Sequence, residues 1–243
     1  MNIKSGTAIN LRQTIAGAQT IVVKIGSKVL VHDDGRVALG VLDSIVESVA
    51  DLRASGRNVV LVSSGAVCIG AEHLKVPPSL VSVCSAAGQS VLTALYHEAF
   101  KRRNLASAQI LVTDDDFARE DRHAKLRNTL QHLLQLSVVP IVNENDVVTH
   151  CPDHDPSTRL LCDNDMLAAL IAKAIEADLL VVLTDVDGVY TTHPNDADAL
   201  LISQMTGPAH IFDSSEQINE RGRGGNVHSP ADGRQVPRSH RPH

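Results

Sequence analysis

The chain has 243 residues, of which 43% are apolar and 21% charged, so its composition is that of a globular protein with a sizeable core. With no Trp, 2% aromatic residues and a formal net charge of −6, it is a poor candidate for binding nucleic acid. Apolar runs fall short of the roughly 20 residues that cross a bilayer, so we expect no membrane partner.

The first segment, residues 1–19, is predicted to be an N-terminal arm that is frayed or forms a short lead-in helix. The first acidic residue is Asp33, as in some transit peptides, but a strand is predicted from Thr20, which leaves little chain for a removable presequence. The four cysteines form no C-x-x-C pair and complete no zinc-ligand spacing, as expected for reduced thiols. We therefore expect a cytoplasmic protein.

From Thr20 onward, short β-branched runs alternate with stretches of helical spacing. Strands are predicted at Thr20–Lys24, Asn58–Ser63, Ala108–Val112, Val138–Val142 and Leu179–Leu183. Helices are predicted at about Gly40–Ser55, Ser82–Arg103, His123–Leu136 and Met166–Ala174. Strands separated by helices favour an α/β fold with a mainly parallel, doubly wound central sheet between helical layers, which is a three-layer sandwich. We find no internal repeat and no interdomain linker.

Polar residues follow the first two predicted strands where these strands end. Lys24 precedes Gly26, and Ser64 precedes a glycine turn at Gly65. In a parallel sheet ligands gather at the carboxyl ends of the strands, where amides freed at a glycine turn and a lysine charge suit phosphate groups. Lys24 could instead be a surface lysine, because the sequence is not the phosphate-binding G-x-x-x-x-G-K-[ST] loop.

Carboxylates and amides crowd the later strand and helix ends. The carboxylates of the segments Asn143–Asp146 and Asp163–Asp165 would repel one another unless the segments hold a cation, an ammonium group or lysines. Two simpler interpretations stay open: Asp163 caps the following helix, and Thr184–Gly188 is only a turn. A metal site at His150, Cys151 and His154 is a further alternative, but we favour a solvated loop there and predict no protein-held metal.

In this order, the segments VVKIGSKVL, VLVSSGAV, NENDVV, DNDMLAAL and LTDVDGVY resemble the amino acid kinase family. Within it they are similar to the glutamate 5-kinase subgroup, which includes the kinase half of bifunctional pyrroline-5-carboxylate synthases. The resemblance covers residues 20–225 and implies the carbamate kinase-like fold. It also implies phosphorylation of the L-glutamate side-chain carboxylate by ATP and Mg²⁺, the first step of proline biosynthesis. Proline as a feedback inhibitor and a homodimer or homotetramer are implied by the same resemblance.

The resemblance also implies roles for individual residues. Lys24 would lie against the ATP phosphates, and Asp165 would orient the active-site lysines. The implied glutamate contacts are Ser64, Asp146 and Asn164, with Asp146 facing the substrate ammonium. The implied nucleotide contacts are Lys24, Gly26, Thr184, Asp185, Gly224 and Gly225.

The sequence departs from the family after Gly225. Where the family has a second phosphate-binding lysine, an ungapped alignment places Ser229, and no lysine follows Lys173. We expect residues 226–243 to be a divergent, disordered tail and the last helix and strand of the family's fold to be missing. These differences leave open a catalytically impaired homologue that binds ligands or co-assembles with intact copies. A sister kinase acting on another small acid or phosphate is the other alternative.

Overall fold

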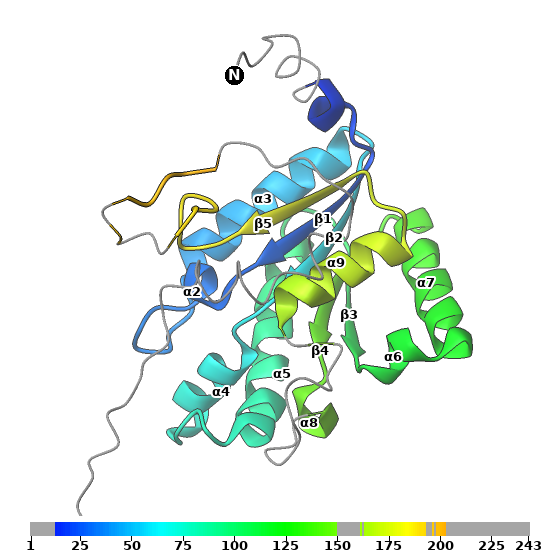
Figure 1. Ribbon diagram of the computed structural model, residues 1–243. Helices are drawn as coiled ribbons and strands as arrows, with labels where there is room; N and C mark the ends of the chain where they lie inside the picture. The colour runs from blue at the N-terminus through cyan, green and yellow to red at the C-terminus, as the bar shows by residue number, and fades with distance from the viewer. Residues whose placement is uncertain (1–12, 150–160, 162, 193–195, 197, 203–243) are drawn as a thin grey trace, which may run out of the picture. The chain divides into compact units, whose positions relative to one another are not determined.

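The computed structural model describes residues 13–149, 161, 163–192, 196 and 198–202 (Figure 1). The chain divides into two compact units, Met1–Asp185 and Val186–His243. The first unit holds every helix and strand named below. In the second, an isolated antiparallel bridge pairs Tyr190 with Leu201, and the Tyr190 hydroxyl donates to Asp187 Oδ1 at 2.8 Å.

Five described strands form one parallel sheet in the first unit. They are β1 (Thr20–Ile25), β2 (Asn58–Ser63), β3 (Ser107–Val112), β4 (Val139–Glu144) and β5 (Leu179–Leu183). Their order across the sheet is β3-β4-β2-β1-β5, and every neighbouring pair is parallel. Since β1 and β2 lie near the middle, most of their residues are apolar on both faces, as expected for a sheet covered on both sides.

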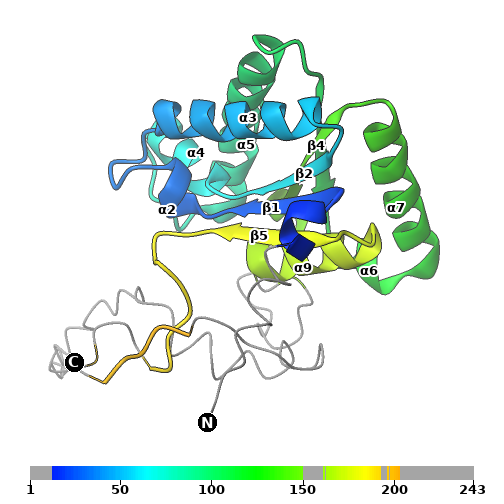
Figure 2. The ribbon, with the colours of Figure 1, turned by 90° about the horizontal axis from the view of Figure 1, so that it is seen from above.

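Helices connect these strands and cover both faces of the sheet (Figures 1 and 2). The described helices are α2 (Ser27–Leu30), α3 (Leu39–Ala54), α4 (Ala66–Leu74), α5 (Val81–Lys101), α6 (Asp115–Ala118), α7 (Glu120–Gln135), α8 (Asp146–Thr149) and α9 (Asn164–Ala174). Residues 13–17 add a short helical turn before β1. The predicted three-layer fold with a mainly parallel sheet is confirmed, and the predicted strands agree with the observed ones to within two residues.

Alternation along the strands creates two separate cores. In β1, Ile21, Val23 and Ile25 pack with residues of α3 and α5, whereas Val22 packs with residues of α7 and α9. Successive side chains of a strand point to opposite faces, so Lys24 shares a face with Val22. This alternation directs the Lys24 side chain towards α9.

Helices α4 and α5 pack against each other at unusually short range. A Cβ atom added at Gly70 would lie 1.8 Å from the Cys84 carbonyl oxygen, and one added at Gly88 would lie 1.8 Å from the Ala66 carbonyl oxygen. These distances are far below van der Waals contact, so any side chain at either position would force the helices apart. The two glycines therefore let α4 and α5 approach closely beside the strand ends.

Candidate functional site

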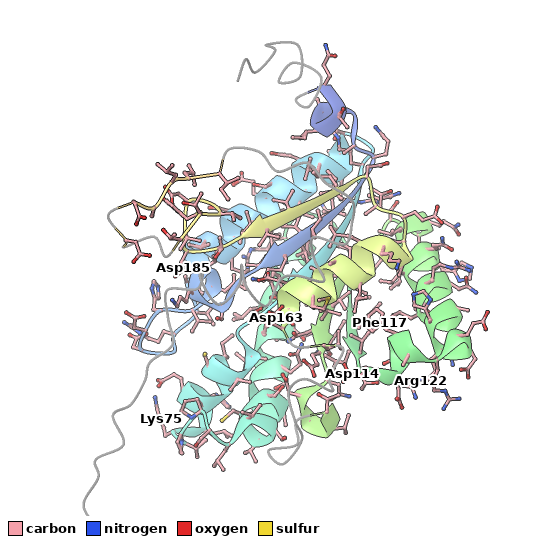
Figure 3. The ribbon with its side chains drawn as sticks, in the orientation of Figure 1. Lys75, Asp114, Phe117, Arg122, Asp163 and Asp185 are labelled. Atoms are coloured by element: carbon pink, nitrogen blue, oxygen red, sulfur yellow. The ribbon has the colours of Figure 1, made fainter. Side chains whose placement is uncertain are left out.

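The carboxyl ends of the strands bring the polar residues of the first unit to one edge of the sheet. Asp163 lies at the start of α9, and Asp185 lies just beyond β5 (Figure 3). Backbone hydrogen bonds tie the strand ends together: Gly26 N donates to Leu183 O at 2.9 Å, and Ser64 N donates to Ile25 O at 3.1 Å. Residues far apart in the sequence thus line one continuous edge, as expected for a parallel sheet.

A partly buried ion pair joins β1 to α9. The Lys24 ammonium lies 2.7 Å from Asp165 Oδ1, and Lys24 is only 9% exposed. Asp165 is in the first turn of α9, where the helix dipole stabilises a carboxylate. Asp163 precedes it as the N-cap and accepts hydrogen bonds from the backbone N–H groups of Asp165 and Met166. Asp163 therefore caps the helix, and Asp165 holds the lysine in place.

A cavity of about 310 Å³ lies beside this pair. Its lining residues are Ser27, Ser64, Gly65, Ala66, Val67, Cys68, Asn143, Glu144, Asp146, Asp163 and Asn164. The side-chain amide of Asn164 donates to Ser64 Oγ at 2.6 Å. All three predicted glutamate contacts, Ser64, Asp146 and Asn164, thus line one cavity although they come from the turn after β2, from α8 and from α9.

The cavity lining combines carboxylates with the start of a helix. Among the residues that the structure describes, the lining includes the carboxylates of Glu144, Asp146 and Asp163 and no lysine, arginine or histidine, which favours a cationic group. It also includes the first turn of α4, whose N-cap Gly65 adopts a left-handed backbone (φ +104°) and has no side chain to accept from the first amides. An uncapped helix N-terminus favours an anion. A cavity with both features suits a small zwitterion.

A second ion pair lies at the ends of β1 and β5. The Lys28 ammonium is 3.0 Å from Asp185 Oδ2, and its hydrogen bond lowers the pKa of the Asp185 carboxyl below the ordinary value. The Thr184 hydroxyl donates to the same carboxylate at 3.3 Å. Gly26 lies close to Lys24 and Thr184, since a Cβ atom added at Gly26 would be 3.6 Å from Lys24 Nζ and 3.9 Å from Thr184 Cα. That these residues and Asp185 contact the nucleotide stays a prediction. Gly224 and Gly225 lie outside the described residues.

Sequence reasoning missed a layer of buried polar residues behind the cavity. Gln89 and Ser85 of α5 are 7% and 2% exposed, and each hydrogen bonds to a residue that lines the cavity. Neither residue follows a strand, and a position directly after a strand is the pattern that predicted the other site residues. The signal that could have found them is their position on the largely apolar, buried face of the helix.

The described part of the chain holds no group of three or more His, Cys, Asp or Glu side chains arranged for a metal ion. The alternative metal loop at residues 150–154 lies outside it. Among the same described residues, no helix has the length and apolar character needed to span a bilayer.

Comparison with known proteins assigns the class. Residues 19–216 match the amino acid kinase family, and the chain belongs to that family. The fold is shared with the isopentenyl phosphate kinase of T. acidophilum in a product complex, at 17% identity and a TM-score of 0.53, over 82% of this chain and 83% of that one.

Two curated relatives are much more similar in sequence. Delta-1-pyrroline-5-carboxylate synthase of Solanum lycopersicum is 40% identical over 212 residues, covering 81% of this chain and 30% of that protein. Glutamate 5-kinase of Marinomonas sp. (strain MWYL1) is 39% identical over 223 residues, covering 89% of this chain and 56% of that protein. The chain thus spans about a third of the first relative and just over half of the second. The predicted resemblance is confirmed.

Proposed function

We propose that this chain transfers the γ-phosphoryl group of ATP to the side-chain carboxylate of L-glutamate, giving γ-glutamyl phosphate, the first intermediate of proline biosynthesis. The observation that carries the proposal is the cavity lined by Ser64, Asp146 and Asn164. It offers carboxylates for an ammonium group and an uncapped helix N-terminus for a carboxylate, and it lies in a chain of the amino acid kinase family. The names of these two relatives support the same substrate.

The nucleotide would bind where β1 and β5 end. Lys24, fixed by Asp165, is placed to neutralise the charge of the transferred phosphoryl group, and Gly26, Thr184 and Asp185 would complete the contacts. Mg²⁺ would be held mainly by the nucleotide phosphates, as in many kinases. A carboxylate acceptor is already ionised at neutral pH. The protein therefore has to position the reactants and stabilise negative charge, and no general base is required.

Proline and a second copy of the chain are the remaining proposed partners. Proline carries the same ammonium and carboxylate groups as the backbone part of glutamate, so the cavity that we propose for glutamate would accept it as a competitor. The homodimer or homotetramer, the cytoplasmic location and the division into an arm, a kinase domain at residues 20–225 and a tail stay predictions.

The decisive test is glutamate-dependent ADP release by this chain with hydroxylamine present to trap the acyl phosphate. We expect ADP release and hydroxamate formation that require both ATP and L-glutamate. Aspartate, N-acetylglutamate and UMP serve as alternative acceptors, and preference for one of them would replace glutamate as the substrate. Binding of ATP and glutamate without turnover would overturn the proposal in favour of an impaired homologue.

A further inference from the structure

Three polar residues of α5 form a stripe along one face of the helix. Ser82, Ser85 and Gln89 are spaced by three and four residues, which places them above one another on a helix. Ser85 and Gln89 are among the most buried polar residues of the described chain, at 2% and 7% exposure. Buried polar side chains are costly unless they are hydrogen bonded, so the partners of this stripe show what it does.

The first two residues of the stripe hold Asp146. Ser82 Oγ donates to the backbone oxygen of Asp146 at 3.1 Å, and Ser85 Oγ donates to its carboxylate Oδ2, also at 3.1 Å. One serine therefore fixes where the main chain of α8 begins, and the other fixes the direction of the carboxylate. Both bonds come from the same rigid helix, which limits the positions that Asp146 can adopt beside the cavity.

The third residue of the stripe acts through a chain of amides. Asn143 Nδ2 donates to Gln89 Oε1 at 2.9 Å, which turns Asn143 Oδ1 away from α5. That oxygen accepts from Asn164 Nδ2 at 3.2 Å and from the backbone N–H of Glu144 at 2.9 Å. Asn164 in turn donates to Ser64 Oγ at 2.6 Å. Gln89 thus orients two cavity residues that it does not touch.

We propose that the stripe formed by Ser82, Ser85 and Gln89 positions the acceptor-binding side chains Ser64, Asp146 and Asn164, and so sets the affinity of the site for an α-amino acid. This inference rests on the function proposed above. None of the three stripe residues lines the cavity, so they are positioning residues. Ser85 acts on the ammonium group of the acceptor through Asp146. Gln89 acts on the acceptor through Asn143, Asn164 and Ser64.

The contact of Ser85 with Asp146 is tested with Ser85→Ala. Removing a hydrogen bond to a charged group changes an equilibrium constant by a factor on the order of ten. We therefore expect the KM for L-glutamate to rise about tenfold. We expect kcat and the KM for ATP to stay unchanged. Glutarate, which lacks the ammonium group, serves as the competing ligand, and its Ki is expected to stay unchanged. Ser85→Thr keeps the hydroxyl and is expected to restore the KM for glutamate.

The contact of Gln89 with Asn143 is tested with Gln89→Met, which keeps the length of the side chain but loses the oxygen that accepts the hydrogen bond. Since Ser64 and Asn164 would contact glutamate and glutarate alike, we expect the KM for glutamate and the Ki of glutarate to rise together. Gln89→Glu keeps an acceptor oxygen and is expected to recover part of the affinity. The matched control is Ser90→Ala, since Ser90 is exposed on the same helix and bonds only locally to Ala87 O among the described contacts.

The outcomes separate this inference from the proposed function. A wild-type chain that is active with glutamate, together with Ser85→Ala behaving like Ser90→Ala, overturns the positioning role and leaves the function standing. A lower melting temperature together with a lower kcat and higher KM values for both substrates also overturns it, because the stripe would then only support the fold. A wild-type chain that neither binds nor phosphorylates glutamate overturns both.

Discussion

At the scale of single residues, the position of Lys24 follows from strand alternation. It lies near the end of a strand whose neighbouring residues are buried in two opposite cores. Its side chain is directed towards α9 and pairs with the Asp165 carboxylate at 2.7 Å. A lysine that is 9% exposed and fixed in this way is preorganised, and it loses little conformational freedom when a phosphate arrives.

Replacement of Lys24 by methionine is therefore expected to lower kcat by about 10²–10³-fold, the usual cost of removing one donor to developing charge. The measurement is glutamate-dependent ADP release at saturating ATP. Lys101→Met, at the exposed end of α5, is the matched control and is expected to keep full activity. A Lys24→Met protein that is folded and has the wild-type kcat would contradict the assigned role.

Much of the candidate site could be predicted because polar residues after parallel strands must meet at one edge. Lys24, Ser64, Asp146 and Asp185 were all found in this way. The polar positions on the buried face of α5 could have pointed to Gln89 and Ser85. Their role could not be predicted, since it depends on which strands α5 covers. The strand order β3-β4-β2-β1-β5 places β4, with Asn143, beside β2, and no local pattern in the sequence encodes that order.

At the scale of elements, the close contact between α4 and α5 supports the edge that carries the cavity. The first turn of α4 lines the cavity, and α5 carries the stripe that holds Asp146. The distance between the two helices is set by Gly70 and Gly88, whose added Cβ atoms would meet backbone atoms rather than flexible side chains. Backbone cannot move aside without shifting a whole helix.

Gly88→Ala is accordingly expected to lower the free energy of unfolding by about 3 kcal/mol or more, at the upper end of overpacking costs. Urea denaturation followed by circular dichroism measures this value. The matched control is Gly40→Ala in α3, where an added Cβ meets nothing within 4 Å. The control should be neutral or stabilise by up to about 1 kcal/mol, the difference in helix propensity. Equal effects at the two positions would show that α4 and α5 can separate at little cost.

The sequence predicted most elements because their patterns are strong and local. The β-branched runs of β2 and β5 were predicted with the observed bounds, Asn58–Ser63 and Leu179–Leu183. The glycine turn at Gly65 was predicted, but the extent of the helix after it was not. It is α4, which is only nine residues long. Its stability depends on tertiary packing against α5, and propensity alone does not define so short a helix.

At the scale of the whole molecule, carboxylates join parts of the first unit that are distant in sequence. Asp178, just before β5, accepts from the backbone N–H groups of Gln19 and Thr20 at 2.8 Å each. These bonds hold the pKa of Asp178 below its ordinary value. Asp43 of α3 accepts hydrogen bonds from Arg103 and Arg102 at the end of α5, which lower its pKa to about 2. Both carboxylates are ionised in the folded protein at neutral pH.

These lowered pKa values predict how folding stability responds to acid. A group with a lower pKa in the folded state contributes stability above its unfolded pKa, about 3.9 for Asp, and the contribution is lost as pH falls through the folded value. For Asp43 the loss falls between about pH 4 and pH 2. Asp43→Asn cannot ionise, so its free energy of unfolding should fall less steeply than that of the wild type over this range. Urea titrations at several pH values from 5 to 2 measure both slopes. Equal slopes would mean that the arginine contacts to Asp43 do not persist in solution, and that α3 and α5 are held together by their apolar contacts alone.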